Sequence, residues 1–346
     1  ADHPHGVYVT GILAASADNA FGVAGVDHGA MILPVKVLDE ANIGTTFDVA
    51  EGLVYAADQG ADVVNMSIGG WGSERILRDA LAYARDAGSV LIASAGNGGL
   101  GDADRTWPGA SPLTVSVGAT DHNDTRANFS GTGDALDVVA AGQLVITVNP
   151  AVSYYLSYFS GTSAAAPIVS GMASLLLSLN EGFTHDQIDQ LLKLGAEDQV
   201  GPKDEDTPGR DDFYGFGRVN LAESLSLAAT VFPVRIDIDP DDELNRIWPS
   251  SRQEVEVAIW GDSGFDVTSV NCQSLGFGPA QASALECEIE DENGDGFDDM
   301  VAEFIINDTG IACGDTDATL VGQTLEGTDI IGIDKVTTIG CGDADE

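Results

Sequence analysis

The sequence predicts an α/β fold with a mostly parallel sheet, followed by a separate β-rich domain. Up to about Leu227, short apolar runs rich in β-branched residues alternate with segments of helical periodicity. Strands that alternate with helices indicate a parallel sheet covered on both faces. From Pro233 onward helical periodicity is absent, and apolar residues alternate with polar ones as in half-buried strands. We therefore expect a first domain over residues 1–229 and an acidic, sandwich-like accessory domain over residues 233–346.

The individual elements follow from the same patterns. Strands are expected where apolar residues run together or alternate, and helices where apolar residues recur every three or four positions. The expected strands are 31–38, 62–66, 89–92, 113–117, 234–238 and 254–259, and the expected helices are 47–59, 73–88, 163–179 and 185–194.

Charge is the most unusual property of the composition. The 346 residues include 56 acidic and 14 basic side chains, a formal net charge of -42 at pH 7. Nucleic-acid binding is excluded, because phosphate contacts require a basic surface. Strong net charge favours solubility but adds self-repulsion, which bound calcium or external salt can offset. No apolar run approaches the ~18 residues of a membrane span. We expect a secreted monomer from a marine or salt-rich setting, the alternative being a merely acidic surface.

All four cysteines lie in the last quarter of the chain. An even number in one domain predicts disulfides and an oxidising compartment. Their spacing lacks the paired CxxC pattern of a zinc site. Three connectivities are open, and we favour Cys272–Cys287 with Cys313–Cys341.

Three segments place reactive side chains at the ends of expected elements. Ser163 lies on the first turn of a helix, where backbone N–H groups and the helix dipole favour a developing anion. His5 precedes a small and apolar helical start at residues 12–15, and Asn97 follows the strand 89–92. A base, an amide donor and a serine are the parts that acyl transfer needs. Taken alone, the Gly-Thr-Ser run also fits an ordinary helix cap.

These segments resemble the motifs of the subtilisin-like serine proteases, the subtilases (peptidase family S8). Residues 5–11 resemble the histidine block, residues 95–97 the oxyanion block and residues 161–167 the serine block. Further matching segments occur in the family's order at 22–26, 35–38, 63–70 and 215–220. The resemblance implies a three-layer subtilisin-like fold. It also implies that Ser163 is the nucleophile, His5 its general base and Asn97 an oxyanion donor.

One part of the family pattern is not in this sequence. Subtilases carry an Asp in an Asp-(Ser/Thr)-Gly block on a strand upstream of the histidine. Only four residues precede His5, and Asp2 is too close along the chain to orient the imidazole. We expect a fragment truncated at its N-terminus, which as given is almost inactive. The alternative is a natural homologue without catalysis.

The resemblance also implies a slot that binds the substrate backbone as an added strand. The expected slot residues are Asn42, Ile43 and Gly44 on one side, Ser67, Ile68 and Gly69 on the other, and Ala95 and Gly96 at the specificity pocket. That pocket would continue toward Thr106, Trp107 and Pro108. Since none of these residues is charged, we expect an uncharged pocket that accepts large apolar or aromatic side chains.

Two loops are candidate calcium sites, with a structural role for the ion. In the loop 291–299, oxygen-bearing side chains at the first, third and fifth positions precede a glycine, as in calcium loops. Its expected ligands are Asp291, Asn293, Asp295, the carbonyl of Phe297, and Asp299. The alternative is a solvated acidic turn. Asn19 matches a ligand position of a family calcium loop.

The sequence thus favours a secreted serine endopeptidase that acts on protein or peptide substrates without a catalytic cofactor. The competing hypothesis is a non-catalytic subtilase homologue that serves as a calcium-binding adhesion or surface protein.

Overall fold

The computed structural model describes residues 3–149, 151, 156–242 and 244–341. The chain forms two compact units. Unit 1 comprises Ala1–Glu181, Ala196–Thr207 and Asp211–Leu221, and unit 2 comprises Gly182–Gly195, Pro208–Arg210 and Ala222–Glu346. The predicted boundary between residues 229 and 233 stays a prediction.

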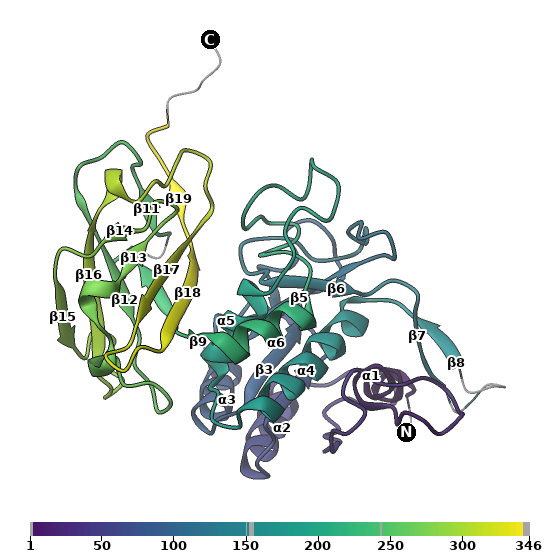
Figure 1. The fold of residues 1–346 in the computed structure, drawn as a ribbon. Helices are drawn as coiled ribbons and strands as arrows, with labels where there is room; N and C mark the ends of the chain where they lie inside the picture. Colours follow the sequence, from purple (N-terminus) through teal and green to yellow (C-terminus); the bar gives the residue numbers. More distant parts are fainter. Residues whose placement is uncertain (1–2, 150, 152–155, 243, 342–346) are drawn as a thin grey trace. The chain divides into compact units, whose positions relative to one another are not determined.

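Unit 1 is built on a parallel sheet. The strands of the whole unit are β1 (Val63–Met66), β2 (Gly70–Trp71), β3 (Val90–Ser94), β4 (Thr106–Trp107), β5 (Val115–Thr120), β6 (Val138–Ala141), β7 (Val145–Val148) and β8 (Leu156–Phe159). The central sheet has the order β1-β3-β5-β6, and all three pairings are parallel. Figure 1 labels its strands β3, β5 and β6. β3 and β5 are buried along their whole length, as expected for a sheet covered on both faces.

Helices cover both faces of this sheet. The helices of unit 1 are α1 (His5–Ala14), α2 (Thr46–Asp58), α3 (Arg75–Asp86) and α4 (Thr162–Leu179). Leu91 and Ala93 of β3 share one core cluster with α2 and α3. Because side chains alternate along a strand, Val90 and Ile92 face the other side, where α4 contacts all four strands. The predicted three-layer α/β architecture is confirmed.

Two sequence expectations for unit 1 are wrong. Residues 31–38 form no strand, and Met31 is 98% exposed. A strand needs a neighbour for its backbone N–H and C=O groups, and among the described residues β1 pairs only with β3. The helix that carries His5 begins at His5 itself rather than after it.

A third correction concerns α4. This helix has 18 residues with a mean hydropathy of 1.5, so by length and composition it could cross a membrane. The expectation that no apolar run approaches this length is therefore wrong for α4. The helix is nevertheless 61% buried, as the core helix of unit 1, which makes it weak evidence for a span.

Unit 2 is rich in strands. They are β9 (Phe232–Pro233), β10 (Ile236–Ile238), β11 (Arg246–Ile247), β12 (Glu254–Ile259), β13 (Gly276–Phe277), β14 (Ala282–Ser283), β15 (Cys287–Glu290), β16 (Asp299–Ile305), β17 (Asp317–Gln323), β18 (Asp329–Lys335) and β19 (Thr337–Thr338). The helices α5 (His185–Leu194) and, except for its first residue, α6 (Leu221–Thr230) also belong to unit 2. Short 3₁₀ turns occur at Val267–Ser269, Cys272–Ser274 and Ile306–Asp308.

The strands of unit 2 form two main sheets around one core. One sheet has the order β10-β12-β16-β15 and the other β14-β13-β17-β18-β9. Phe304 of the first sheet and Phe277 of the second are fully buried, and their ring centroids lie 5.2 Å apart. The core cluster draws on both sheets, which confirms the predicted β-rich, sandwich-like region.

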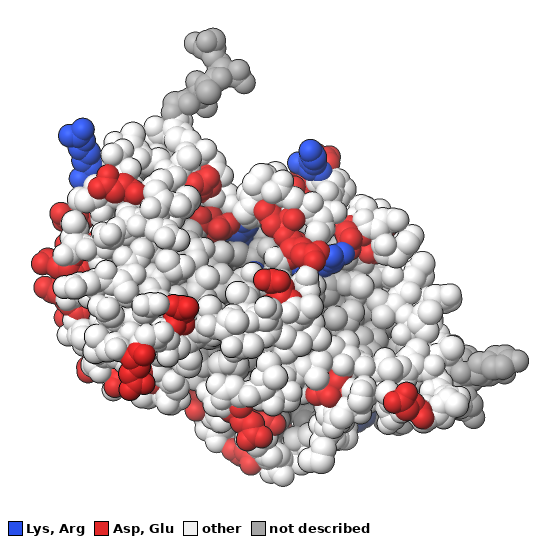
Figure 2. Space-filling view, in the orientation of Figure 1, with Lys and Arg blue, Asp and Glu red and all other residues white. Residues whose placement is uncertain are grey.

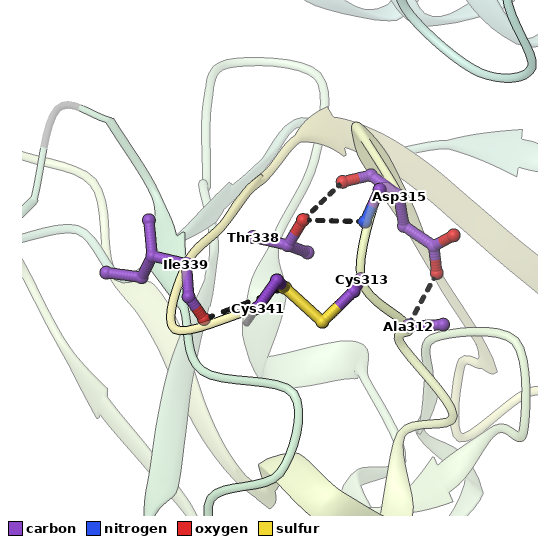
Figure 3. The surroundings of a disulfide bond; sticks show 7 residues. Ala312, Cys313, Asp315, Thr338, Ile339 and Cys341 are labelled. Carbon is purple, nitrogen blue, oxygen red and sulfur yellow. Dashed lines mark hydrogen bonds between the residues drawn. A yellow bond between two sulfur atoms is a disulfide. The ribbon is translucent and has the colours of Figure 1, made fainter. Parts of the chain in front are cut away.

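Both predicted disulfides are present in unit 2. Cys272 is bonded to Cys287 and Cys313 to Cys341. Beside the second bond, the Thr338 hydroxyl accepts the backbone N–H of Gly314 at 3.0 Å and donates to the Asp315 carbonyl at 3.5 Å (Figure 3). The favoured connectivity is thus confirmed.

Candidate active site

One cavity in unit 1 brings together the three reactive residues expected from the sequence. It has a volume of about 570 Å³ and is lined by His5, Asn97 and Ser163. These residues are far apart in the chain and come from the start of α1, the loop after β3 and the first turn of α4. The carboxyl ends of parallel strands are the usual place for such a site.

Ser163 is held at the start of α4 by reciprocal hydrogen bonds with Ser67. Its hydroxyl donates to the Ser67 carbonyl at 3.2 Å, and the Ser67 hydroxyl donates to the Ser163 carbonyl at 3.0 Å. Gly161 precedes the helix with φ 143°, a value that disfavours any residue with a Cβ. Within the described residues, the Ser163 hydroxyl makes no hydrogen bond to His5. The side chain must therefore rotate before His5 can take its proton.

Asn97 is oriented by Thr162. The backbone N–H of Thr162 donates to Asn97 Oδ1 at 2.9 Å, and the Thr162 hydroxyl lies 3.2 Å from the same oxygen. Because Oδ1 accepts these bonds, the Nδ2 amide is the end of the side chain that can donate to a ligand. Sequence reasoning did not identify Thr162, although it stands beside Ser163 in the motif.

His5 is partly buried at the N-terminus of α1. The His5 and Phe159 rings form a T-shaped contact, with their centroids 5.4 Å apart. Burial, and secondarily the neighbouring charge of His3, lowers the pKa of His5 below its usual value. A lowered pKa keeps the imidazole neutral near pH 7, which is the form that accepts a proton. Among the described residues no carboxylate is hydrogen-bonded to His5, and Asp2 lies outside them.

The expected substrate slot also lines the cavity. Residues 42–44 and 67–69 and Gly96 all contribute to its surface. Asn42 has φ 62°, and the turn around it is closed by Asp39, whose carboxylate accepts the N–H of Ile43 at 3.0 Å. Ala95 is fully buried behind the cavity and does not line it.

A carboxylate that sequence reasoning missed lies in the expected specificity pocket. Asp102 lines the cavity together with Thr106, Trp107 and Pro108, and it is only 6% exposed. The expectation of an uncharged pocket is therefore wrong. The chain folds back between Gly98 and Thr106, which brings Asp102 to the pocket wall, and no motif in the sequence indicates this return.

The proposed calcium residues form local turns. Asp291, Asn293 and Asp295 each accept a backbone N–H of their own loop, at 3.2, 2.8 and 2.9 Å. Asp299 is buried and accepts the N–H of Gly261 at 2.9 Å. Phe297 is exposed in the same loop.

Asn19 likewise accepts a backbone N–H, that of Phe21, at 3.0 Å. In the part of the chain that the structure describes, no three His, Cys, Asp or Glu side chains are grouped to hold a metal ion. Calcium at either loop stays a prediction.

Comparison with known proteins decides the family. The model of the subtilase family, Peptidase S8, matches residues 1–217. The chain belongs to the subtilase family. This subtilase is 41% identical over 221 residues to thermitase of Thermoactinomyces vulgaris, which covers 64% of the chain and 74% of thermitase.

Two further comparisons agree. The subtilase is 37% identical over 244 residues to the cell wall-associated protease of Bacillus subtilis (strain 168), covering 66% of the chain but only 27% of that protease. A solved protease of Pseudoalteromonas arctica superposes with a TM-score of 0.59 at 31% identity, covering 65% of this chain and 70% of the other. The chain thus spans about a quarter of the length of the Bacillus protein.

Proposed function

We propose that this subtilase is a secreted serine endopeptidase that hydrolyses peptide bonds through an acyl-enzyme. Membership of the family supports peptidase activity. The single observation that supports the catalytic detail is the cavity shared by His5, Asn97 and Ser163.

In the proposed mechanism, His5 removes the proton of the Ser163 hydroxyl as its oxygen attacks the scissile carbonyl carbon. The oxyanion that forms accepts hydrogen bonds from Asn97 Nδ2 and from the Ser163 backbone N–H. His5 then gives the proton to the leaving amine. Water, activated by the same imidazole, releases the acyl group and regenerates Ser163.

The proposal includes an orienting Asp from a segment upstream of Ala1 in the whole protein. Such a carboxylate fixes the imidazole and stabilises its protonated form. Residues 1–346 alone should therefore have very little activity, because losing this Asp costs ~10⁴ in kcat. The substrate backbone would lie as an added strand between residues 42–44 and 67–69.

The nucleophile is tested by labelling the full-length protein with an active-site phosphonate. We expect one labelled site, Ser163, and loss of labelling and of peptide hydrolysis in Ser163→Ala. Ser178→Ala is the matched control, since Ser178 is an exposed serine on the same helix. Labelling that persists in Ser163→Ala would show that another residue is the nucleophile.

The competing proposal, a non-catalytic surface protein, is favoured by one observation. The Ser163 hydroxyl points to the Ser67 carbonyl and not to His5. Full-length protein that neither labels nor hydrolyses peptides, although it carries an upstream Asp block, would support this alternative.

Secretion is proposed from two properties of the chain. Disulfides persist in oxidising compartments, and unit 2 has two of them. A net charge of -42 suits a protein that stays soluble and monomeric in a salt-rich medium. Fractionation of the native host into medium, envelope and cytoplasm tests this, and a wholly cytoplasmic protein would contradict it.

We also propose a structural calcium ion in the loop 291–299. The residues fit in type, because carboxylate, amide and carbonyl oxygens are the ligands that calcium prefers. An ion that binds only the folded loop stabilises it by roughly 2.7 kcal/mol at a hundredfold excess over Kd. Millimolar calcium should therefore raise the melting temperature of unit 2 relative to chelator.

The matched variant for this proposal is Asp295→Ala. It should remove most of the calcium effect, and sodium chloride at equal ionic strength should not reproduce the effect. An equal shift in the wild type and the variant would mean that the loop is only a solvated acidic turn. Asn19→Ala tests the second loop in the same way, and its effect should be confined to unit 1.

A further inference from the structure

Asp102 is a nearly buried carboxylate in the wall of the active-site cavity. Its Oδ2 accepts the backbone N–H of Gly98 at 2.7 Å. The loop that carries it is closed on both sides, because the Asp102 N–H donates to the Gly99 carbonyl and the Thr106 N–H donates to the Asp102 carbonyl. Backbone contacts thus hold the carboxylate in place, and it is not a flexible surface group.

The absence of side chains on two glycines lets this carboxylate approach the oxyanion loop. A Cβ on Gly98 would lie 2.7 Å from Asp102 Oδ1, and a Cβ on Gly96 would collide with Oδ2. Gly96 also has φ +97°, which disfavours any residue with a Cβ. Since Asn97 stands between these glycines in the chain, the carboxylate packs against the backbone of the loop that carries the expected oxyanion donor.

No protein cation neutralises Asp102 within the described residues. The nearest arginine in the chain, Arg105, donates its Nε to the Gly101 carbonyl instead. No Lys or Arg lines the cavity. A buried charge without a partner is costly, and a ligand cation that enters the cavity removes part of that cost.

We propose that Asp102 makes this site selective for substrates with Lys or Arg immediately before the scissile bond. The inference rests on the proposed peptidase function and adds its substrate class. In the slot that the family resemblance implies, the residue whose carbonyl oxygen is bound by Asn97 would place its side chain along Gly96, and Asp102 lies against Gly96. Electrostatic attraction then favours a cationic end group and disfavours a carboxylate.

The rest of the pocket suits the long stem of such a side chain. Ile68, Leu77 and Trp107 contribute apolar surface to the same cavity. Lys and Arg pack their methylene stems on apolar surface while the charged end finds a polar partner. The chain's net charge of -42 also attracts cationic peptides before they bind.

The test compares peptide substrates that differ only in the residue before the scissile bond. The full-length enzyme should cleave Lys and Arg peptides with a kcat/KM at least about tenfold above those of the norleucine and Glu peptides. The comparison of the Lys peptide with the norleucine peptide is decisive, because norleucine has the same stem as Lys without the ammonium group. Asp102→Asn should abolish the Lys-over-norleucine preference, because kcat/KM for the Lys peptide should fall to near that for the norleucine peptide.

Asp104→Asn is the matched control. Asp104 lies in the same loop and loses the same charge, but it is exposed and does not line the cavity. It should keep the wild-type preference. A wild type that prefers norleucine, or an Asp102→Asn variant that loses Lys and norleucine cleavage equally, would overturn the proposal.

A second measurement separates this proposal from the proposed function. The Ser163→Ala variant should bind the Lys peptide more tightly than the norleucine peptide, and Ser163→Ala/Asp102→Asn should bind both equally. Active enzyme with no Lys preference refutes only the role of Asp102. Protein that fails to label at Ser163, cleaves no peptide and shows no Lys preference in binding refutes both proposals.

Discussion

The two units of this subtilase place their charges differently. In unit 1 the central strands β3 and β5 are uncharged and buried, and the reactive residues lie in the segments beyond the strand ends. In unit 2 the strands themselves carry acidic residues, and Glu256 of β12 lies directly opposite Glu303 of β16. Asp and Glu are spread over the face shown in Figure 2.

The acidic strands of unit 2 repel one another. Loss of hydration, and then the charges of Glu286, Glu254, Glu256 and Glu288, raise the pKa of Glu303. Like charges opposite each other in a sheet are destabilising. Both disulfides are in this unit, and a disulfide stabilises a fold mainly by constraining the unfolded chain. The difference teaches that unit 1 keeps charge out of its core strands, whereas unit 2 carries acidic residues on its strands and adds two covalent links to its own core.

The largest expected effect would separate chemistry from stability in unit 1. Asn97→Ala should lower kcat about 10²–10³-fold, the range known for an oxyanion-hole donor in this same family. The melting temperature should fall modestly, because the buried Thr162 N–H loses its acceptor at a cost of about 1–3 kcal/mol. Asn123→Ala, in another exposed turn, is the control. Unchanged kcat in Asn97→Ala would remove this residue from the mechanism.

The next effect tests the covalent links of unit 2. Replacing Cys313 and Cys341 by Ser opens a loop of 28 residues. The chain-entropy model gives a loss of about 3–4 kcal/mol for a loop of this size. Hydrogen exchange should quicken in β17 and β18, and β3 and β5 should stay protected. Equal loss of protection in both units would show that they do not differ in this way.

A smaller effect concerns pH. Burial, and then the charge of Asp237, raises the pKa of Asp334 to about 6. The folded state therefore holds this proton more tightly than the unfolded state does. The free energy of unfolding of unit 2 should fall by on the order of 2 kcal/mol as the pH rises from 4 to 7. Urea unfolding at these pH values should show this slope, and Asp334→Asn should flatten it. Asp308→Asn, at an exposed position, should not.

The smallest effect is a shift in the pH profile of unit 1. His3 is the second cause of the lowered pKa of His5, after burial. His3→Ala should therefore raise the pKa of His5. Since the neutral imidazole is the base, the acidic limb of the kcat/KM profile should move to higher pH. His28→Ala, at an exposed histidine, should leave the limb in place, and a shift to lower pH in His3→Ala would contradict the assigned cause.

The sequence predicted most of this organisation. The alternation of patterns located the parallel sheet and the β-rich region, and the three motifs named His5, Asn97 and Ser163, which the structure brings to one cavity. The disulfide pairing was also predicted, since the favoured one of the three possible connectivities is the one that the structure has.

The failures share a physical cause. Residues 31–38 have strand-like residues but no neighbour to pair with, and pairing depends on other parts of the chain. Asp102 reaches the pocket only because its loop returns beneath Gly96 and Gly98. Composition and periodicity describe segments one at a time, so they contain no information about such returns.

The contact between Thr162 and Asn97 has a further consequence for how the rate depends on temperature. The Thr162 N–H and hydroxyl join the start of α4 to the loop after β3 through Asn97 Oδ1 and the Gly96 carbonyl. In the proposed mechanism, the two oxyanion donors therefore belong to segments that are hydrogen-bonded to each other through Thr162. Because these segments are already held together, the substrate has less ordering to impose on them during acylation. Thr162→Val, which keeps the shape but loses the hydroxyl, should make the activation entropy of acylation more negative in an Eyring plot.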